Sequence, residues 1–435
     1  MSNKVVRYFL ISIILYNLLL RSISFEQHGG DSWSHSLRTL TLLDYGRVSW
    51  YLNPLSLFGL YPFSYASGIS LFSGSLVLTT SIPINQLLII TSIFFSLLAN
   101  LSLFMLCRNL NFSTEVSLLS MFFLSSTLAY LSFTYSVLST RGALISLTPI
   151  VSFVLLKTYN KNIDYRFLLL SLTGIISLAS IHLMFGHFLV LICIPLILYK
   201  FSNYFYPKFE YRISNRSNSL ILFIIFIIFI VQFLGVNWIK KGVRYYYPVL
   251  PDSNVVYSII NIISSYLHAY GPHSAFFIFG FLFILFTVKD SKKRFILYPT
   301  VLSPFFIFDT GYFLAFYTFI FSIFTAYGFL QILKSDSLEY RLPILFSLVT
   351  YIPVIAYYFS STYLIIFLIT LTCFLLVLVN LYIKDNKAAV AICMFIILTA
   401  SYPINQVTVK DFRENEAYPN SGDYLVGSQH ENRGL

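Results

Sequence analysis

Long apolar runs recur along almost the whole sequence. Of its 435 residues, 57% are hydrophobic and only 10% are charged, and the mean hydropathy is +0.77. A soluble domain is closer to a quarter charged and avoids exposing apolar surface of that extent. The same figures exclude a disordered chain, a coiled coil and a disulfide-rich scaffold. We therefore expect a polytopic membrane protein.

The apolar runs predict an all-α transmembrane bundle. Counting those long enough to cross a bilayer about 30 Å thick gives about thirteen spans. A further apolar stretch at 63–82 contains Gly68 and Gly74, and we interpret it as a juxtamembrane or re-entrant segment. The predicted spans lie near 6–24, 84–107, 116–135, 142–158, 167–182, 187–200, 218–238, 273–288, 295–310, 313–333, 342–359, 363–383 and 388–403.

Basic residues predict the orientation. With a cytoplasmic N-terminus, the short inner loops collect most of the lysines and arginines, as cytoplasmic loops usually do. Topology thus accounts for the net charge of +11 without a nucleic-acid partner. The layout gives a transmembrane domain at 1–403, long external loops at 25–83 and 239–272, and a short external tail at 404–435. All seven histidines fall on the outer side or at its membrane edge, so we expect external polar chemistry in a multi-pass cell-membrane protein.

The first external loop carries the most informative polar pattern. Two glycines precede Asp31, and Gly46 suits a helix end, so a helix is predicted over 32–44 with Asp31 at its N-terminus. Asp31, His35 and Arg38 are spaced i, i+4 and i+7 and share one face of that helix. Lying on the membrane, such a helix would direct this row toward a cavity. The opposite face carries Trp33, Leu37 and Leu40.

The same three residues also have a purely structural interpretation. Asp31 can cap the helix, a role that is common for aspartate and contributes about 1 kcal/mol. His35 can be a surface histidine, and Arg38 can anchor the helix to lipid phosphates. Spacing alone does not decide between the two interpretations.

The first loop resembles that of the GT-C superfamily of membrane glycosyltransferases. The resemblance rests on Asp31, on Arg38 seven residues later, on a glycine-containing turn, on Trp50 and Tyr61-Pro62, and on the serine- and glycine-rich stretch that follows. It is strongest over residues 1–160. The superfamily includes the catalytic subunit of oligosaccharyltransferase and the protein mannosyltransferases. The resemblance implies transfer of a sugar from a polyprenyl-phosphate-linked donor to a glycan, lipid or protein acceptor at the cell envelope.

The resemblance also implies roles for individual residues. Asp31 would be the base that takes a proton from the acceptor hydroxyl, with His35 beside it in the catalytic group. The leaving phosphate needs cations at the outer membrane edge. Asp309, in a brief outer turn, is a candidate second acid or a helix cap. The candidate phosphate-binding residues are Arg38, Arg141, Lys240 and Arg244.

Each cation also has a structural alternative, and the sequence departs from the family at one motif. Lys240 can simply snorkel to the interface, and Arg141 can contact lipid headgroups. Oligosaccharyltransferase has paired acidic residues between its third and fourth spans, where this chain has Ser139-Thr140-Arg141. We therefore do not expect a metal site of that kind, although a divalent cation such as Mg²⁺ or Mn²⁺ remains open as a cofactor. His182 and His187 flank another outer turn, but their spacing alone is weak support for a metal pair.

Three other functions remain open. A transporter or flippase for lipid-linked oligosaccharide should carry charges inside its spans, and the predicted span interiors are nearly free of them. A polymerase of the O-antigen type should have arginine-rich outer loops in the middle of the chain. A non-catalytic protein on the GT-C scaffold would also be compatible with the missing acidic pair.

Overall fold

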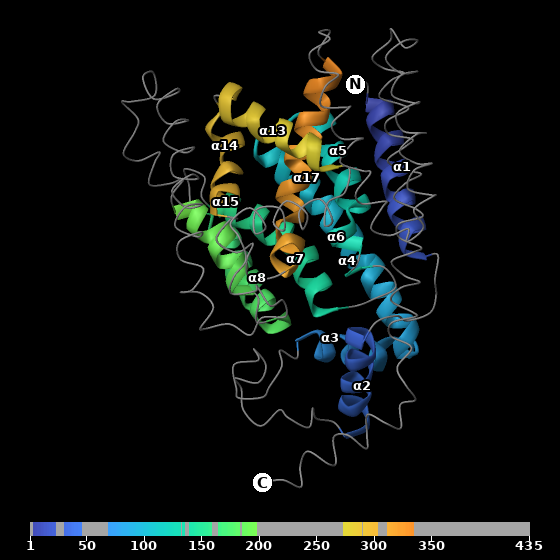
Figure 1. The fold of residues 1–435 in the computed structure, drawn as a ribbon. Coiled ribbons are helices and arrows are strands. Elements are labelled where there is room, and N and C mark those ends of the chain that lie inside the picture. Colours follow the sequence, from blue (N-terminus) through green and yellow to red (C-terminus); the bar gives the residue numbers. More distant parts are fainter. Residues whose placement is uncertain are drawn as a thin grey trace, which may run out of the picture.

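The computed structural model describes residues 3–22, 30–45, 68–131, 133–134, 139–158, 164–182, 185–197, 273–288, 290–302 and 311–334. Within these ranges the chain forms helices and no strand (Figure 1). This agrees with the predicted all-α class. Four predicted spans, at 218–238, 342–359, 363–383 and 388–403, lie outside the described residues, so the total of about thirteen stays a prediction.

Long helices form the body of the molecule. Of the described helices, α4 and α7 are long and apolar enough to cross a membrane by length and composition. α4 packs extensively on α7, and α17 packs on both α5 and α13. The body consists of α1 (Asn3–Ser22), α4 (Ile84–Asn109), α5 (Thr114–Ser126), α7 (Thr140–Thr158), α8 (Tyr165–Ile181), α13 (His273–Thr287) and α17 (Gly311–Lys334).

Short elements complete the described part. α6 (Leu128–Leu131) follows α5, and α9 (Phe185–Phe188) leads into the π-helical turn η2 (Leu189–Cys193). α14 (Ser291–Arg294) and α15 (Leu297–Leu302) lie between α13 and α17 in sequence. The expected span at 295–310 is therefore described only in part.

Local side-chain chemistry sets several helix ends. The side chain of Ser113 accepts a hydrogen bond from the Val116 N–H at 3.3 Å and caps α5. Asp164 caps α8 in the same way, accepting from the Arg166 N–H at 2.9 Å. The expected span at 116–135 is wrong as a single helix, because Thr127 has extended backbone angles and separates α5 from α6.

Helices α13 and α17 approach closely at two glycines. A Cβ on Gly280 would collide with the carbonyl oxygen of Phe324, and one on Gly328 would collide with that of Phe276. Glycine thus permits a backbone contact that any side chain would prevent. Phenylalanines fill the surrounding contact: the rings of Phe277 and Phe321 stack at 4.8 Å between centroids.

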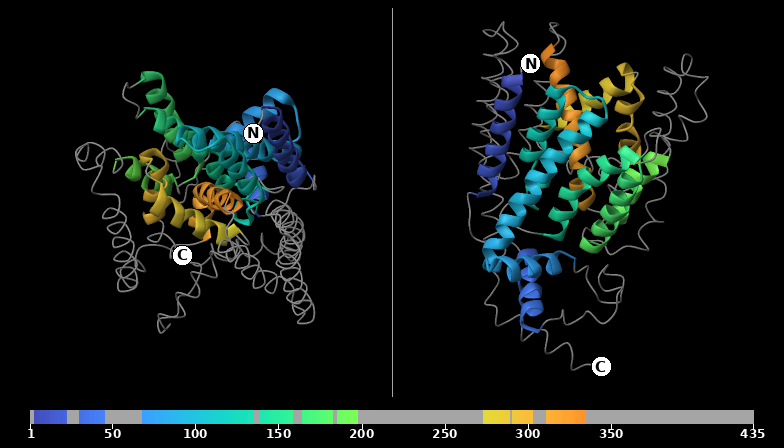
Figure 2. Two further views of the ribbon diagram at one scale, coloured as in Figure 1. Left: turned by 90° about the horizontal axis from the view of Figure 1, so that it is seen from above. Right: turned by 180° about the vertical axis from the view of Figure 1, so that it is seen from behind.

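Two helices of the first loop lie together at one end of the body. These are α2 (Gly30–Tyr45) and α3 (Gly68–Thr80), and they pack on each other and on α4. They occupy the same end of the molecule in the view from behind (Figure 2). The predicted helix over 32–44 is thus present. The stretch interpreted as juxtamembrane or re-entrant contains a helix that starts at Gly68 and includes Gly74.

Candidate functional site

Helix α2 turns one face toward the protein and leaves another uncovered. His35 is 3% exposed and Thr39, one turn later, is fully buried. Leu37 is 68% exposed and Leu40 is 42% exposed. Exposed leucines on a helix at the end of a membrane bundle suit contact with lipid. The separation of faces follows the predicted pattern, with the imidazole on the side of the body.

Asp31 is the second residue of α2, because the helix begins at Gly30. Asp31 thus lies in the first turn of the helix, and the structural interpretation of Asp31 as the residue that caps the helix does not hold. A carboxylate in the first turn is still favoured, since the helix N-terminus carries partial positive charge. Asp31 stands one turn before His35, so their backbone positions share a face of α2. The side chain of Asp31 lies outside the described residues.

His35 is held as a neutral imidazole. Burial, and then the positive charges of Arg38 and His182, lower the pKa of His35 to about 3. An imidazole with this pKa is a poor proton acceptor at neutral pH. It remains able to donate and accept hydrogen bonds through its two nitrogens. His35 therefore fits a binding or positioning role better than the role of a general base.

Helix α8 ends beside this part of α2. His182, the residue after the last residue of α8, is near enough to His35 to affect its pKa. Ser180, just before it, lies against α3: a Cβ on Gly68 would be 2.7 Å from the Ser180 hydroxyl oxygen. The fold thus brings together two histidines, His35 and His182, whose proximity the sequence did not indicate.

A second polar group surrounds Arg21 near the end of α1. The guanidinium is fully buried and donates from Nε and Nη2 to the hydroxyl oxygen of Thr134, at 3.2 and 3.0 Å. Nη1 donates to the Asn17 side-chain oxygen, which also accepts from the Ser96 hydroxyl at 2.8 Å. The guanidinium carbon lies 5.1 Å from the centroid of the Tyr130 ring. Among the described residues, Arg21 has no carboxylate partner.

Sequence reasoning missed Arg21, although a signal was present. Asn17 and Arg21 are spaced i, i+4 in an otherwise apolar span and therefore share a helix face. A buried charge in a span costs several kcal/mol and usually marks a functional position. We expected span interiors nearly free of charged residues, and Arg21 in α1 is an exception.

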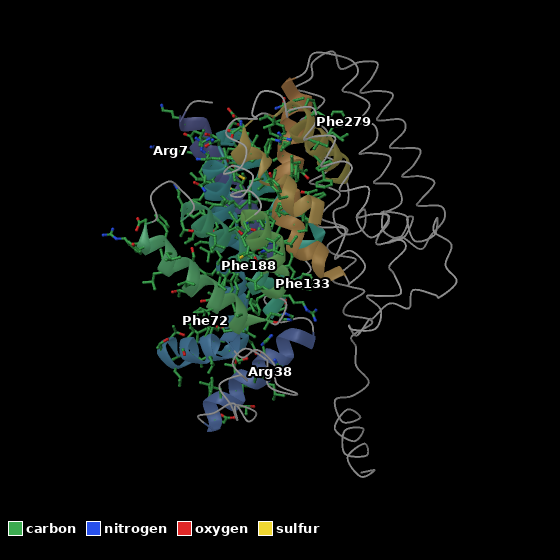
Figure 3. All side chains as sticks on the ribbon, turned by 90° about the vertical axis from the view of Figure 1, so that its left-hand side faces the viewer. Arg7, Arg38, Phe72, Phe133, Phe188 and Phe279 are labelled. Carbon is green, nitrogen blue, oxygen red and sulfur yellow. The ribbon has the colours of Figure 1, made fainter. Side chains whose placement is uncertain are left out.

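Arg141 lies one residue inside the start of α7 and is half-buried. Its guanidinium carbon is 5.9 Å from the centroid of the Phe133 ring. The preceding Ser139 caps the helix, accepting from the Gly142 N–H at 2.9 Å. Since Phe133 is next to Thr134, Arg21 and Arg141 approach neighbouring residues of the segment after α6. Arg38 lies toward one end of the molecule, opposite Arg7 and Phe279, and Phe133 lies between them (Figure 3).

The described side chains do not fit a metal site. No group of three or more histidine, cysteine, aspartate or glutamate residues lies close enough within the described ranges to hold an ion. At the turn before α7, the residues in place of the acidic pair are engaged otherwise: Ser139 in a cap and Arg141 over an aromatic ring.

Three predicted site residues lie outside the described part of the chain: Lys240, Arg244 and Asp309. The side chain of His187 also lies outside it. The structure therefore brings together His35, Arg38 and His182, and places Arg141 beside the Arg21 group. The roles of Lys240, Arg244 and Asp309 stay predictions.

The fold is similar to those of two solved glycosyltransferases. The apo oligosaccharyltransferase from Archaeoglobus fulgidus matches with a TM-score of 0.53 and 11% identity, over 94% of this chain and 56% of that one. The same enzyme tethered to an acceptor peptide matches with a TM-score of 0.52 and 12% identity, over 94% and 55%. Apo ArnT from Cupriavidus metallidurans matches with a TM-score of 0.53 and 9% identity, over 93% and 76%. The sequence matches no protein-family model and no curated protein.

The chain thus has the fold that the archaeal oligosaccharyltransferase and ArnT share. This confirms the resemblance seen in the first loop. The chain spans little more than half the length of the archaeal enzyme, 56% of it. At identities this low, the likeness establishes the fold, and activity has to be argued from the site.

Proposed function

We propose that the protein is a membrane glycosyltransferase that transfers a sugar from a polyprenyl-phosphate-linked donor to an acceptor at the external face. The observation that carries this proposal is that α2, with Asp31 and His35, lies at the end of the helical body toward which the last turn of α1, with Arg21, is directed (Figure 1). A base and a set of cations are the two things that this reaction needs at one place.

The reaction needs a single carboxylate in this scheme. When the acceptor hydroxyl attacks the anomeric carbon, the glycosidic bond to the phosphate breaks and the phosphate leaves with the electron pair. A phosphate leaves without protonation, unlike the alkoxide in glycoside hydrolysis, where a second carboxyl group serves as acid. Asp31 takes the proton of the attacking hydroxyl. His35 stays neutral and positions groups by hydrogen bonding.

Positive charge at this end favours the departing phosphate. Arg38 and Arg141 are half-buried, so each guanidinium can interact with an anion more strongly than in bulk water. Arg21 is the cation that the structure adds, and its charge is held in a buried polar environment. Lys240 and Arg244 belong to the same proposal as further phosphate contacts, with Asp309 as a carboxylate that can pair with Arg141 or Arg244.

A specific observation keeps one alternative in view. A transporter of lipid-linked oligosaccharide is expected to carry charge inside its spans, and Arg21 is such a charge. Its partners in the described residues are uncharged, and it stands in the last turn of α1 rather than at mid-span. That position fits a site at the membrane edge better than a path across the bilayer.

A reconstitution assay tests the proposal. The full chain is placed in proteoliposomes and supplied with a short-chain polyprenyl phosphate hexose as donor, with glycan, lipid and peptide acceptors in parallel. We expect donor-dependent transfer to one acceptor class and release of polyprenyl phosphate. Translocation of the donor between leaflets without transfer would contradict the proposal and support the transporter.

A further inference from the structure

Four polar atoms at the contact of α2 with α3 are buried and have no hydrogen-bond partner among the residues that the structure describes. They are Nδ1 of His35, Oγ1 of Thr39, and Oγ of Ser70 and Ser73. All four residues are at least nine-tenths buried. Buried polar groups are hydrogen-bonded in the great majority of cases, so each exception needs an explanation, such as a bound ligand or water.

These atoms share one interface. His35 and Thr39 are one turn apart on α2, and Ser70 and Ser73 are i, i+3 on α3, so each pair occupies one helix face. The faces meet where a Cβ on Gly74, one turn after Ser70, would be 3.8 Å from the Thr39 methyl carbon. We call His35, Thr39, Ser70 and Ser73 the α2–α3 polar interface.

Helix α8 shows how the two faces are aligned. Gly68, at the start of α3, lies against Ser180, and His35 lies near His182. The early parts of α2 and α3 are therefore both directed to the end of α8. With Thr39 beside Gly74, this alignment places His35 on the side of Ser70. The four unpartnered atoms thus form one group rather than four isolated exceptions.

The chemistry of the group selects the ligand. Three hydroxyls and a neutral imidazole can each both donate and accept hydrogen bonds, and none of them carries charge. A phosphate binds best to cationic side chains, whereas the hydroxyl groups of a sugar form hydrogen bonds with neutral polar groups such as these. The two helices lie close together at Gly74, where an added Cβ would be 2.8 Å from the side chain of Leu42. The interface therefore has to open before a ligand can enter.

We propose that the α2–α3 polar interface binds the hydroxyl groups of the donor sugar when α2 and α3 separate. This rests on the proposed function and names the part of the donor that the interface would recognise. Opening is favoured because the closed interface leaves these polar atoms without hydrogen bonds to any described residue. One turn along α2, Asp31 would then stand beside the bound sugar.

A comparison of two ligands tests the proposal. The full chain in nanodiscs is titrated with a short-chain polyprenyl phosphate hexose and with the same polyprenyl phosphate lacking the sugar. We expect wild-type protein to bind the sugar-bearing ligand more tightly. Thr39→Val and Ser73→Ala should each lower the affinity for the sugar-bearing ligand by about threefold to tenfold, the value of one hydrogen bond. Neither should change the affinity for the ligand without the sugar.

Exposed neighbours provide matched controls. Ser75→Ala on α3 and Thr41→Val on α2 remove hydroxyls that bond back to Leu71 and Leu37 in their own helices. Neither should change the affinity for either ligand. Without ligand, Thr39→Val and Ser73→Ala should keep or raise the Tm, because each removes an unsatisfied group.

The outcomes separate this inference from the proposed function. Equal affinity of wild-type protein for the two ligands would overturn the inference alone. So would Thr39→Val and Ser73→Ala variants that lower the affinity for both ligands equally, or for neither. A lowered Tm without ligand would show that the hydroxyls are structural, and would also overturn it. Wild-type protein that binds neither ligand would overturn the proposed function and the inference together.

Discussion

The guanidinium of Arg21 and the hydroxyl of Thr134 join two segments that are 113 residues apart in sequence. Two donors of one planar fork, Nε and Nη2, converge on one oxygen atom at 3.2 and 3.0 Å. This bond ties the last turn of α1 to the segment between α6 and α7. Arg141 approaches the same segment from α7 through the Phe133 ring.

Replacing Arg21 by lysine should destabilise the protein. Lysine keeps the charge but lacks the planar guanidinium, so it cannot donate hydrogen bonds to Thr134 and Asn17 at the same time. We expect a loss of about 3 kcal/mol, the value of one or two hydrogen bonds to a charged group. Thermal unfolding in detergent measures it. Arg7→Lys, at an exposed position of the same helix, should leave the Tm unchanged; a similar loss there would contradict the account.

The contact of α13 with α17 should not tolerate a methyl group. In Gly280→Ala the new Cβ meets the carbonyl oxygen of Phe324, so the helices must move apart. Overpacking of this kind costs about 1 to 3 kcal/mol. Gly186→Ala is the matched control, because nothing lies within 4 Å of an added Cβ there. An unchanged Tm for Gly280→Ala would show that the helices do not meet at these glycines.

Acid should weaken the packing of α2 through His35. The folded pKa is about 3 and the ordinary value is 6.5, so between these values the unfolded state binds the proton and the folded state does not. Stability therefore falls as the pH falls below about 6.5, and from pH 7 to pH 5 the loss is about 2 kcal/mol. Tm measured across this range for wild-type protein and His35→Gln tests it. The variant should lose less; identical pH profiles would show that His35 is not buried as a neutral group.

Arg141 and Lys157 offer a comparison within one helix. Each cation lies over a phenylalanine ring, Arg141 near the start of α7 and Lys157 near its end. If Arg141 binds the donor phosphate, Arg141→Gln should raise the donor KM about tenfold through loss of a charge-assisted hydrogen bond. Lys157→Gln should leave KM unchanged. Equal effects in the two variants would indicate a general effect of surface charge.

The apolar runs predicted the described helices well, because a span has to be long and apolar whatever it packs against. The break at Thr127 was missed, since Thr127 belongs to a run of serines and threonines whose side chains bond back to their own helix. The pattern in the first loop correctly predicted the helix that contains His35 and Arg38. Periodicity could not show that Thr39 lies beside Gly74, because the pairing of α2 with α3 depends on the close approach at that glycine.

Arg21 illustrates a different limit. The i, i+4 spacing with Asn17 was visible, but the partners Ser96, Tyr130 and Thr134 come from three other segments that only the fold brings together. The same is true of His35 and His182. Contacts between segments far apart in the sequence produce no local periodicity. Asp31, His35 and Arg38 lie on one helix, so their regular spacing could be seen in the sequence.

Two aspartates of α2 allow the most direct test of the proposed chemistry. Asp31→Asn removes the proposed base in the first turn, and Asp44→Asn removes an exposed carboxylate near the other end of the same helix. In the reconstituted transfer assay, we predict that Asp31→Asn lowers kcat by at least about a hundredfold, the low end of the contribution of a general base. Donor binding should stay unchanged, and the loss of stability should not exceed about 1 kcal/mol, the value of a first-turn carboxylate. Asp44→Asn should transfer at the wild-type rate. Full activity of Asp31→Asn would contradict the account.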